Sequence, residues 1–372
     1  MLHLIAGNLF GGVETLLLTL ARERDFCPAM DPHFGVCFEG RVSGELRSAG
    51  VPVHMLGAVR ISRPWSVWRA RRRLKAILER EHFDVVICHM AWTMAMFGRV
   101  ARSANTKLVF WAHGFQNSRG WLERMARRIT PDLALANSRA TALSLPGMWT
   151  GIESRQLYYP VELPQDDERE SWRSSLRREF GVAEKGTVII QVSRLEAWKG
   201  HGLHLRALSL LKDVPGWTCW LVGGAQNAEE ERYLDGLKKS VAELGIADRV
   251  RFLGQRSDVR HLLTAGDIFC QPNEAPEPFG IVFIEGLWAG LPVVTTAIGG
   301  AIEIVDETCG VLTKPDDPES LAASLRLLIE SGELRSRLGA GGPARAEKLC
   351  APSAQIRTLG ELMRKVAVTP AP

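Results

Sequence analysis

Short apolar stretches alternate with longer segments of helical periodicity along most of the chain. In the first half the apolar stretches include LHLIAG (2–7), DVVICHM (84–90) and KLVFWAH (107–113). Segments such as SVWRARRRLKAILER (66–80) lie between them and repeat apolar residues every three or four positions. Near-continuous apolar strands joined by helices are typical of a parallel sheet covered on both faces. The first half therefore predicts a doubly wound α/β unit.

The same alternation returns after a polar, charged segment over residues 160–180. That segment predicts an interdomain connection running into a helix. The strands predicted beyond it include TVIIQVS (187–193), DIFCQPN (267–273) and LPVVTTA (291–297). Parallel sheets bind ligands beyond the carboxyl ends of their strands, so two facing units would place a cleft between them.

The domain boundaries follow from this break. We expect an N-terminal domain over residues 1–163 and a C-terminal domain over residues 164–351. A final helical pattern, residues 352–368, is expected to pack back on the N-terminal domain.

Composition adds a few limits. The chain has 46% hydrophobic and 24% charged residues and a net charge of +4, which neither demands nor excludes an anionic partner. Its seven cysteines are scattered, with no C-x-x-C and no metal-ligand spacing, and predict buried free thiols. We see no secretory signal and no run long enough to span a bilayer, and we expect a cytoplasmic protein.

The first candidate site is QVSRLEAWKG, residues 191–200. A strand is predicted to end near Ser193, and a helix to begin near Gly200. Arg194 and Lys199 would then lie in the loop between them, and two cations beside a helix N-terminus suit a diphosphate. The alternative is that both are surface cations in ordinary salt bridges.

The second candidate site lies in EAPEPFGIVFIEG, residues 274–286. Prolines on both sides of Glu277 restrict its backbone. Phe279, Gly280 and Ile281 open a helix whose free N–H groups could hold phosphate. Glu285 lies about two turns further on, where a buried carboxylate needs a partner such as a sugar hydroxyl pair. The alternatives are an exposed loop acid at Glu277 and a salt bridge at Glu285.

Two glycine pairs lead from predicted strands into predicted helices. Gly11 and Gly12 permit a tight turn close to a ligand, and Gly299 and Gly300 form a second potential anion nest. A plain glycine turn is the alternative for each pair.

Taken together, these motifs resemble glycosyltransferase family four, a retaining family of the GT-B fold. The C-terminal half carries the resemblance in order and spacing, through S-R-x4-K-G at 193–200, L-V-G-G at 221–224, F-L-G at 252–254, E-x7-E at 277–285, A-G-L-P-V-V at 289–294 and G-G-x-x-E-I-V at 299–305. The N-terminal half matches more loosely, through G-G-V-E at 11–14, W-A-H-G at 111–114 and A-N-S at 136–138. The fold that it implies is two Rossmann-like parallel-sheet domains facing a central cleft.

The resemblance also implies catalytic roles. Arg194 and Lys199 would bind the donor's diphosphate and neutralise the leaving group. Glu277 would sit beside the transferred sugar and hydrogen-bond its hydroxyls. His113 would contact the sugar near its 6-position.

The remaining implied roles concern the donor. Glu285 would hold the ribose, and the base would lie near Gly254 and Gln255. The backbone over residues 279–281, comprising Phe279, Gly280 and Ile281, would face the diphosphate, and Gly12 would form the floor on the N-terminal side. The chain departs from the family pattern at Gly114, where an acid often follows the histidine, and at Tyr159-Pro160, which replaces a usual Asn-Gly pair. Both departures bear on the acceptor more than on the donor.

The implied reaction is transfer of a sugar from a nucleotide-diphosphate sugar, with retention, to a glycan, lipid-linked or small-molecule acceptor. Cations and helix N-termini would stabilise the leaving diphosphate, so neither a metal nor a cofactor is expected. No D-x-D motif offers a metal site, and we interpret Asp166, Asp167 and Glu168 as solvated. A sugar-nucleotide epimerase or an inverting transferase of the same fold is the alternative, and a non-catalytic binding protein is a further one.

Residues 60–80 are densely basic and carry Trp65 and Trp68. This segment could dock on anionic lipid, or it could be a solvated helix whose tryptophans pack into the sheet. We favour the second interpretation, and no motif supports nucleic-acid binding. His89 ends a predicted strand and is either an acceptor contact or a core histidine.

Overall fold

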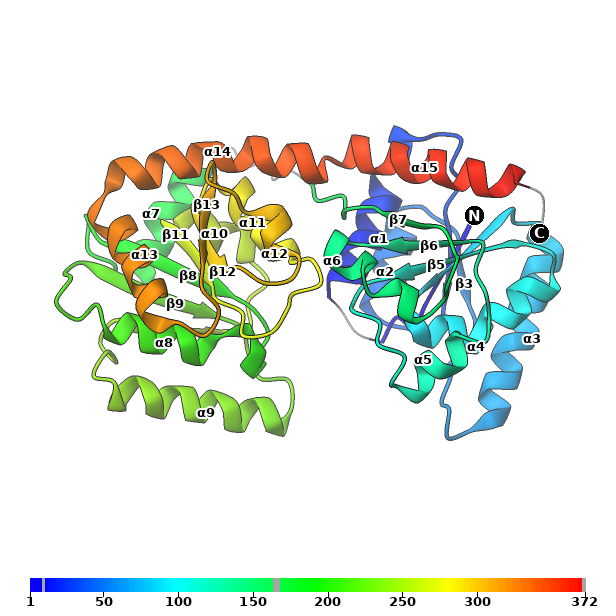
Figure 1. Ribbon diagram of the computed structural model, residues 1–372, viewed down its shortest axis with the longest axis horizontal. Helices are drawn as coiled ribbons and strands as arrows, with labels where there is room; N and C mark the ends of the chain where they lie inside the picture. Colours follow the sequence, from blue (N-terminus) through cyan, green and yellow to red (C-terminus); the bar gives the residue numbers. More distant parts are fainter. Residues whose placement is uncertain (9–10, 163–167, 370–372) are drawn as a thin grey trace. The chain divides into compact units, whose positions relative to one another are not determined.

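The computed structural model describes residues 1–8, 11–162 and 168–369. Its contacts divide the chain into two compact units. Unit 1 comprises Met1–Glu162 together with Cys350–Pro372, and unit 2 comprises Leu163–Leu349. Each unit is built on one parallel sheet with helices on both faces (Figure 1). The predicted pair of doubly wound α/β units is therefore confirmed.

Unit 1 has a seven-stranded sheet in the order β3-β2-β1-β4-β5-β6-β7. All its paired strands are parallel. The strands are β1 (Leu2–Ile5), β2 (His33–Val36), β3 (Val53–Met55), β4 (Val85–His89), β5 (Lys107–Ala112), β6 (Leu133–Ala136) and β7 (Ser154–Gln156). The edge strand β7, with the sequence SRQ, was not predicted, because it is short, polar and largely exposed.

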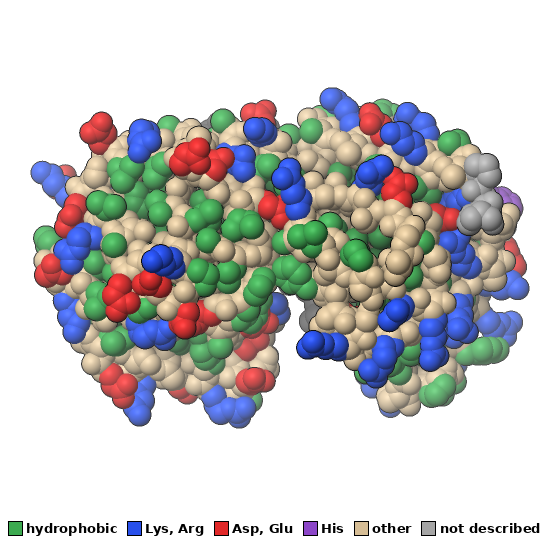
Figure 2. Space-filling model, in the orientation of Figure 1, with side chains coloured by type: hydrophobic (Ala, Val, Ile, Leu, Met, Phe, Trp, Pro, Cys, Tyr) green, Lys and Arg blue, Asp and Glu red, His purple; other side chains and the backbone are tan. Residues whose placement is uncertain are grey.

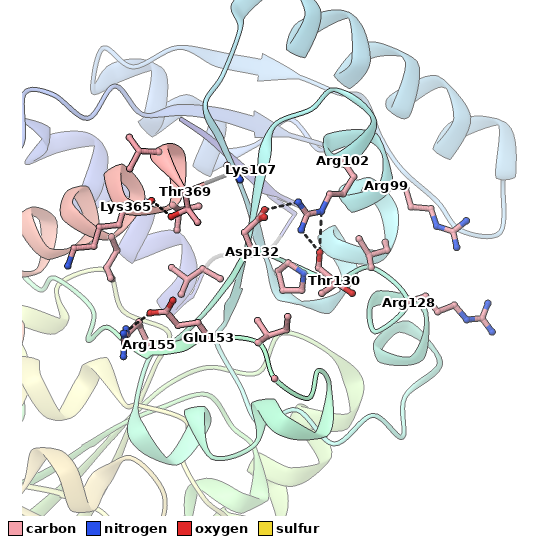
Figure 3. Close-up of a pocket in the computed structure, with 18 residues that line it drawn as sticks. Arg99, Arg102, Lys107, Arg128, Thr130, Asp132, Glu153, Arg155, Lys365 and Thr369 are labelled. Atoms are coloured by element: carbon pink, nitrogen blue, oxygen red, sulfur yellow. Dashed lines mark hydrogen bonds and ion pairs between the residues drawn. The ribbon is translucent and has the colours of Figure 1, made fainter. Parts of the chain in front are cut away.

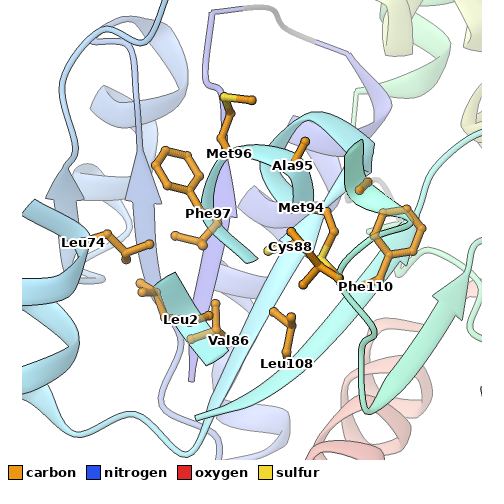
Figure 4. Close-up of a cluster of buried hydrophobic side chains, with 14 of the residues drawn as sticks. Leu2, Leu74, Val86, Cys88, Met94, Ala95, Met96, Phe97, Leu108 and Phe110 are labelled. Carbon is orange, nitrogen blue, oxygen red and sulfur yellow. The ribbon is translucent and has the colours of Figure 1, made fainter. Parts of the chain in front are cut away.

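The helices of unit 1 bury their apolar stripes against this sheet. They are α1 (Gly12–Arg22), α2 (Arg41–Ser48), α3 (Pro64–Glu81), α4 (Met90–Ser103), α5 (Trp121–Ala126), α6 (Arg139–Ala142) and α15 (Pro352–Val368), with short 3-10 turns at Arg24–Phe26 and Leu145–Gly147. Figure 4 shows part of the core, where Leu74 of α3 and Phe97 of α4 lie near Leu2 and Val86 of the sheet, and Met94 of α4 lies near Phe110.

Unit 2 has a six-stranded parallel sheet in the order β10-β9-β8-β11-β12-β13. Its strands are β8 (Thr187–Val192), β9 (Trp217–Val222), β10 (Val250–Gly254), β11 (Ile268–Gln271), β12 (Val293–Thr296) and β13 (Gly310–Thr313). Its helices are α7 (Arg169–Glu179), α8 (His201–Ser209), α9 (Ala228–Glu243), α10 (Val259–Ala265), α11 (Ile281–Trp288), α12 (Ala301–Ile304), α13 (Pro318–Glu330) and α14 (Gly332–Cys350), with a 3-10 turn at Ala197–Lys199.

Two further expectations can be compared with this fold. All seven cysteines are buried and unpaired, as predicted. The preferred interpretation of the basic helix is wrong, because Trp65 and Trp68 do not pack into the sheet. Their residues are 55% and 59% exposed on α3, which turns Ala70 and Leu74 toward the core instead. Among the described residues, no helix is both long enough and apolar enough to cross a bilayer.

The backbone of helix α14 packs directly against backbone atoms of unit 2, because glycines take the place of larger side chains at the points of contact. A Cβ atom at Gly341 would lie 2.0 Å from the carbonyl oxygen of Thr308, and one at Gly339 would lie 2.3 Å from that of Gly290. Backbone atoms cannot yield as side chains can, so these positions require glycine. A Cβ at Gly236 in α9, by contrast, meets nothing within 4 Å.

These two kinds of helical glycine give a matched test. We expect Gly341→Ala to destabilise unit 2 by about 1–3 kcal/mol, because the new methyl group forces α14 away from the sheet layer. Gly236→Ala should be neutral or stabilise by up to about 1 kcal/mol, because it only removes backbone freedom from a helix interior. Urea unfolding of both variants measures the difference, and equal midpoints would refute the close-packing argument.

Candidate functional site

Unit 2 brings its two main candidate loops together at the carboxyl end of its sheet. Strands β8 and β11 are neighbours, with Ile189 opposite Ile268 and Ile190 opposite Phe269. The loops that follow them carry Lys199 and Glu277. The backbone N–H of Glu274 donates to the carbonyl of Trp198 at 2.8 Å, which joins the two loops directly.

Lys199 and Glu277 form an ion pair that is largely shielded from solvent. The Lys199 Nζ lies 2.5 Å from the Glu277 Oε2, and the two side chains are only 12% and 11% exposed. Asn273 Nδ2 donates to the same oxygen at 3.3 Å. The Lys199 ammonium also lies 3.9 Å from the ring centroid of Trp198, a cation–π distance. The structure thus brings together a cation and a carboxylate that the sequence placed in separate motifs.

Buried polar groups beneath the loop hold the backbone of Lys199. Gln191, at the end of β8, donates from Nε2 to the Lys199 carbonyl at 2.8 Å. Its Oε1 accepts from His204 Nδ1 at 2.8 Å. The next residue, Gly200, has φ +75°, and a Cβ there would lie 1.7 Å from the Pro272 carbonyl oxygen. Only glycine fits this close approach of the two loops.

Arg194 does not join that ion pair. Its side chain is 61% exposed and pairs with Glu196, with Nη1 and Oε1 at 3.0 Å. The structure therefore places Arg194 as a surface cation near the same strand end, and its assignment to the donor's diphosphate stays a prediction.

Helix α11 begins four residues after Glu277, where the sequence predicted a helix to open. Gly280 precedes it with φ +98°, Ile281 is its first residue, and Phe279 is buried. The Gly299-Gly300 pair packs on this loop, and the Gly300 N–H donates to the Glu277 carbonyl at 2.7 Å. That N–H is consequently used within the protein, as a plain glycine turn would use it, and an anion nest at this glycine pair stays a prediction.

Glu285 lies in the second turn of α11 and is partly buried. Burial raises the pKa of its carboxyl above the usual value, and the positive charge of Arg260 acts in the opposite direction. Within residues 1–8, 11–162 and 168–369 no hydrogen-bond or ion-pair partner occupies its carboxylate. The salt bridge considered as an alternative is therefore absent from that part of the chain.

The loop predicted to lie near the nucleobase of the donor follows β10. Gly254 adopts φ +67°, and its carbonyl accepts from the Gly223 N–H at 2.9 Å. A Cβ at Gly224 would lie 2.7 Å from the backbone nitrogen of Gln255. The loops after β9 and β10 therefore touch through backbone at this point.

In unit 1, the expected glycine loop leads into α1. This helix starts at Gly12, and the Gly11 N–H donates to the Glu14 Oε2 at 3.0 Å. Residues 9 and 10 of that loop lie outside the described residues, as do Asp166 and Asp167 of the polar connection. Among the described residues, no group of three His, Cys, Asp or Glu side chains could hold a metal ion.

His113 follows β5 and is buried within unit 1. Its Nε2 lies 2.8 Å from His89 Nδ1, and its Nδ1 is bonded to the Tyr159 hydroxyl at 2.5 Å. His89 Nε2 in turn lies 2.9 Å from His3 Nδ1. His89 is therefore a hydrogen-bonded core histidine, the second of its two interpretations.

A cavity of about 1090 Å³ on unit 1 lies at the opposite, amino ends of its strands. Its lining includes Lys107 at the start of β5 and Asp132 just before β6 (Figure 3). Arg102 is bonded to Asp132 at 2.8 Å and to the Thr130 carbonyl, and in Figure 3 Arg128 points away from these residues. Because its cations do not converge, this cavity is not the candidate site.

Several residues in these contacts were not predicted. They share a position beside a predicted residue, and they are Gln191, Trp198, Asn273 and Tyr159. Asn273 had a usable signal, since it directly follows a buried strand at the ligand end of the sheet. Trp198 and Gln191 gave none, because a tryptophan in a loop and a glutamine in a strand are both common.

Known proteins resemble this chain in sequence and in structure. The model of the family "Glycosyl transferases group 1" matches residues 173–345, and that of the "Glycosyl transferase 4-like domain" matches residues 9–149. The lipopolysaccharide core biosynthesis mannosyltransferase LpsB of Rhizobium meliloti is 24% identical over 295 residues, which cover 77% of this chain and 75% of LpsB. A D-inositol 3-phosphate glycosyltransferase of Geodermatophilus obscurus is 30% identical over 286 residues, covering 71% of this chain and 63% of that protein.

A solved structure agrees over nearly the whole length. The crystal structure of HepE from Anabaena in complex with UDP-glucose has a TM-score of 0.83 and 25% identity, and the match covers 98% of this chain and 99% of HepE. Two Rossmann-like units of this kind form the GT-B fold. The chain belongs to the group 1 glycosyltransferases, as its motifs predicted.

The buried histidines predict a loss of stability in acid. Burial lowers the pKa of five histidines from the usual value of 6.5. The pKa falls to about 3 for His89 and His204 and to about 4 for His201, and it lies well below 6.5 for His3 and His113. The folded state therefore binds fewer protons than the unfolded state, so stability is complete above pH 6.5 and falls toward pH 4.

His204 offers a single-residue test of this effect. Each such histidine should lower the free energy of unfolding by about 1.4 kcal/mol for each pH unit below 6.5, down to its own pKa in the folded state. In His204→Leu, the difference between the stabilities at pH 7 and pH 5 should shrink by about 2 kcal/mol. Urea unfolding at the two pH values measures it, with the exposed His82→Gln as control. An unchanged difference in His204→Leu would contradict the neutral, buried state of His204.

Proposed function

We propose that the protein transfers a sugar from a nucleotide-diphosphate sugar with retention of the anomeric configuration. The observation that carries this proposal is the shielded contact between Lys199 and Glu277. Breaking the bond between the anomeric carbon and the diphosphate leaves negative charge on phosphate and positive charge on the sugar. A cation and a carboxylate held side by side match those two charges.

Several groups are proposed to bind the leaving diphosphate. An ammonium group has three N–H donors, so Lys199 can bind phosphate oxygens in addition to Glu277. Arg194, exposed nearby, supplies a second cation for the diphosphate. The first turn of α11, which follows the same loop, favours negative charge through the helix dipole. A leaving group stabilised in this way does not require a metal ion.

Glu277 is proposed to position the sugar rather than to act as a nucleophile. Its carboxylate is fixed by Lys199 and Asn273, and it keeps acceptor capacity for sugar hydroxyls. Glu285, which lacks a partner among the described residues, is proposed to accept hydrogen bonds from the ribose. The backbone at Gly254 and Gln255 is proposed to lie beside the base.

Unit 1 contributes His113 and Gly12 to this proposal, as the resemblance implies. The acceptor is proposed to be a glycan, a lipid-linked sugar or a small molecule. LpsB is named for mannose transfer and HepE was solved with UDP-glucose, so a hexose donor is the class that we propose.

Substitution of either Lys199 or Glu277 should greatly reduce the rate of sugar transfer. We expect Lys199→Ala and Glu277→Ala each to lower kcat by about 100-fold or more, because each removes a charge aimed at the breaking bond. The exposed Lys185→Ala is the matched control and should retain full activity. Transfer from UDP-, GDP-, ADP- and TDP-sugars is measured, with thermal shift confirming that each variant folds. Normal turnover in either site variant would disprove the assignment.

The stereochemical outcome and the metal requirement are tested on the wild-type protein. An α-linked donor should yield an α-linked product by NMR, and addition of EDTA should not change the rate. A β-linked product would favour an inverting transferase, and loss of rate with EDTA would overturn the metal-free mechanism.

We also propose that unit 1 touches an anionic membrane through α3. Trp65 and Trp68 lie on the face opposite the buried residues, and each is followed four positions later by an arginine, Arg69 and Arg72 respectively. The Arg69 guanidinium carbon lies 5.1 Å from the Trp65 ring, and that of Arg72 lies 4.9 Å from the Trp68 ring. Exposed tryptophans among cations are typical of helices that lie in a membrane interface.

The charge of the two units supports this contact. Residues 1–162 and 350–372 contain 24 Lys and Arg against 14 Asp and Glu, whereas residues 163–349 contain 22 against 28. Figure 2 shows blue Lys and Arg side chains gathered over the part of unit 1 where Figure 1 places α3, α4 and α5. Each cation near an anionic surface contributes about 1 kcal/mol of attraction.

Vesicle co-sedimentation tests the membrane contact. The wild-type protein should bind vesicles that contain phosphatidylglycerol and not vesicles of phosphatidylcholine alone. Trp65→Ala/Trp68→Ala should lose most binding, and Arg69→Gln/Arg72→Gln should weaken it by about 30-fold. Lys238→Gln/Lys239→Gln removes two cations from α9 of unit 2 and should bind normally. Equal binding to both vesicles, or a preference for RNA, would sink this contact while leaving the transfer reaction in place.

A further inference from the structure

Three histidines and a tyrosine form one hydrogen-bonded chain across the sheet of unit 1. The chain runs from His3 in β1 to His89 in β4, then to His113 after β5, and ends at Tyr159. All four side chains are buried. Neighbouring imidazoles meet edge to edge in nearly parallel planes, with ring centroids 5.2 Å apart for His3 and His89 and 5.0 Å apart for His89 and His113.

The sheet itself produces this alignment. His3 lies opposite Ile87, and His89, two residues further along β4, shares the face of Ile87. His89 in turn lies opposite Trp111, and His113 follows Trp111 by two residues. Each histidine is therefore displaced by two residues from the one before, which keeps all three on one face of the sheet.

The direction of these hydrogen bonds is the same at every step. Each imidazole uses Nδ1 toward the next member, and His89 and His113 use Nε2 toward the previous one. A neutral imidazole has one N–H, and each bond between two rings needs one donor and one acceptor. If His89 carries its proton on Nδ1, then His3 and His113 must do so as well, and the same holds for Nε2. The three rings therefore share one tautomer.

The tautomer follows from His3, the first member of the hydrogen-bonded chain. Among the described residues, His3 Nε2 is fully buried and has no hydrogen-bond partner. An unpaired buried N–H is rarer in proteins than an unpaired acceptor. The proton therefore belongs on Nδ1 of each ring, and His113 donates to the oxygen of Tyr159. Asn137 Nδ2 lies 3.3 Å from that same oxygen.

We infer that His89 and Tyr159 are positioning residues that hold the ring of His113 neutral, in one tautomer and in one plane. This inference rests on the proposed function, which places His113 beside the transferred sugar. A positive charge on His113 would oppose the positive charge that develops on the sugar as its bond to the diphosphate breaks. To accept a second proton, the chain would have to leave an N–H of His3 unpaired.

The tyrosine explains a departure from the family pattern. Tyr159-Pro160 stands where the family usually has Asn-Gly, and its hydroxyl supplies the partner of His113 Nδ1. With His89 at Nε2, both ring nitrogens of His113 are engaged inside unit 1. A hydroxyl of the sugar that approaches this ring must therefore share Nδ1 with Tyr159.

Nitrogen-15 NMR of the histidine-labelled, full-length protein tests the chain without reference to activity. At neutral pH we expect His3, His89 and His113 to be neutral and protonated on Nδ1, with resonances assigned by single substitutions. A protonated ring, or a mixture of tautomers among the three, would overturn the inference. Wild-type protein without transfer activity would refute the proposed function instead, and the NMR result would still decide the tautomers.

A matched pair of variants separates positioning from simple packing. The amide of His89→Asn falls near the Nδ1 position and can still face His113, whereas that of His89→Gln falls near Nε2 and faces His3. We expect His89→Gln to lower kcat about tenfold more than His89→Asn, with the KM for donor unchanged in both. Tyr159→Phe should lower kcat about three- to tenfold at unchanged KM. Equal kcat in the two His89 variants, both folded at the assay temperature, would reduce the chain to a structural role.

Discussion

The pairing of β8 with β11 is the contact on which the candidate site depends. It is made by apolar residues, such as Ile189 opposite Ile268, and it contains no catalytic group. Because both strands are parallel, their following loops leave the same edge of the sheet, and Lys199 meets Glu277 from 78 positions away. A shift of one residue in this register would turn every side chain of one strand to the other face and separate the two loops.

The ion pair that results is costly to maintain. The free-energy cost of removing two charges from water roughly offsets their mutual attraction, so a shielded salt bridge is weak evidence for stability. The same holds for Gln191 and His204, which place polar groups in a core that apolar residues could fill. Their joint effect is to fix the Lys199 backbone and to aim its ammonium at one carboxylate oxygen. Local costs of this kind are expected where function, and not stability, selects the residues.

The sequence predicts what depends on local pattern and fails where the strand order decides. Apolar runs identified nearly all the strands, and the start of α11 just after Gly280 followed from glycine and helix periodicity. The histidine chain could not be predicted, because His3, His89 and His113 are separated irregularly and become neighbours only in the order β1-β4-β5. The exposure of Trp65 was missed for another reason, since a helix with apolar residues on both faces does not reveal which face is buried.

The two units also show why net charge does not locate a site. Unit 2 has more acidic than basic residues, yet it holds the cation proposed to bind the donor's diphosphate. Charges beyond about 10 Å are screened by salt, whereas Lys199 acts at contact distance behind a shield of protein atoms. The excess of cations on unit 1 would act differently in the proposed membrane contact. It is spread over an exposed surface, where many weak attractions to an extended anionic surface can add up and none has to be placed accurately.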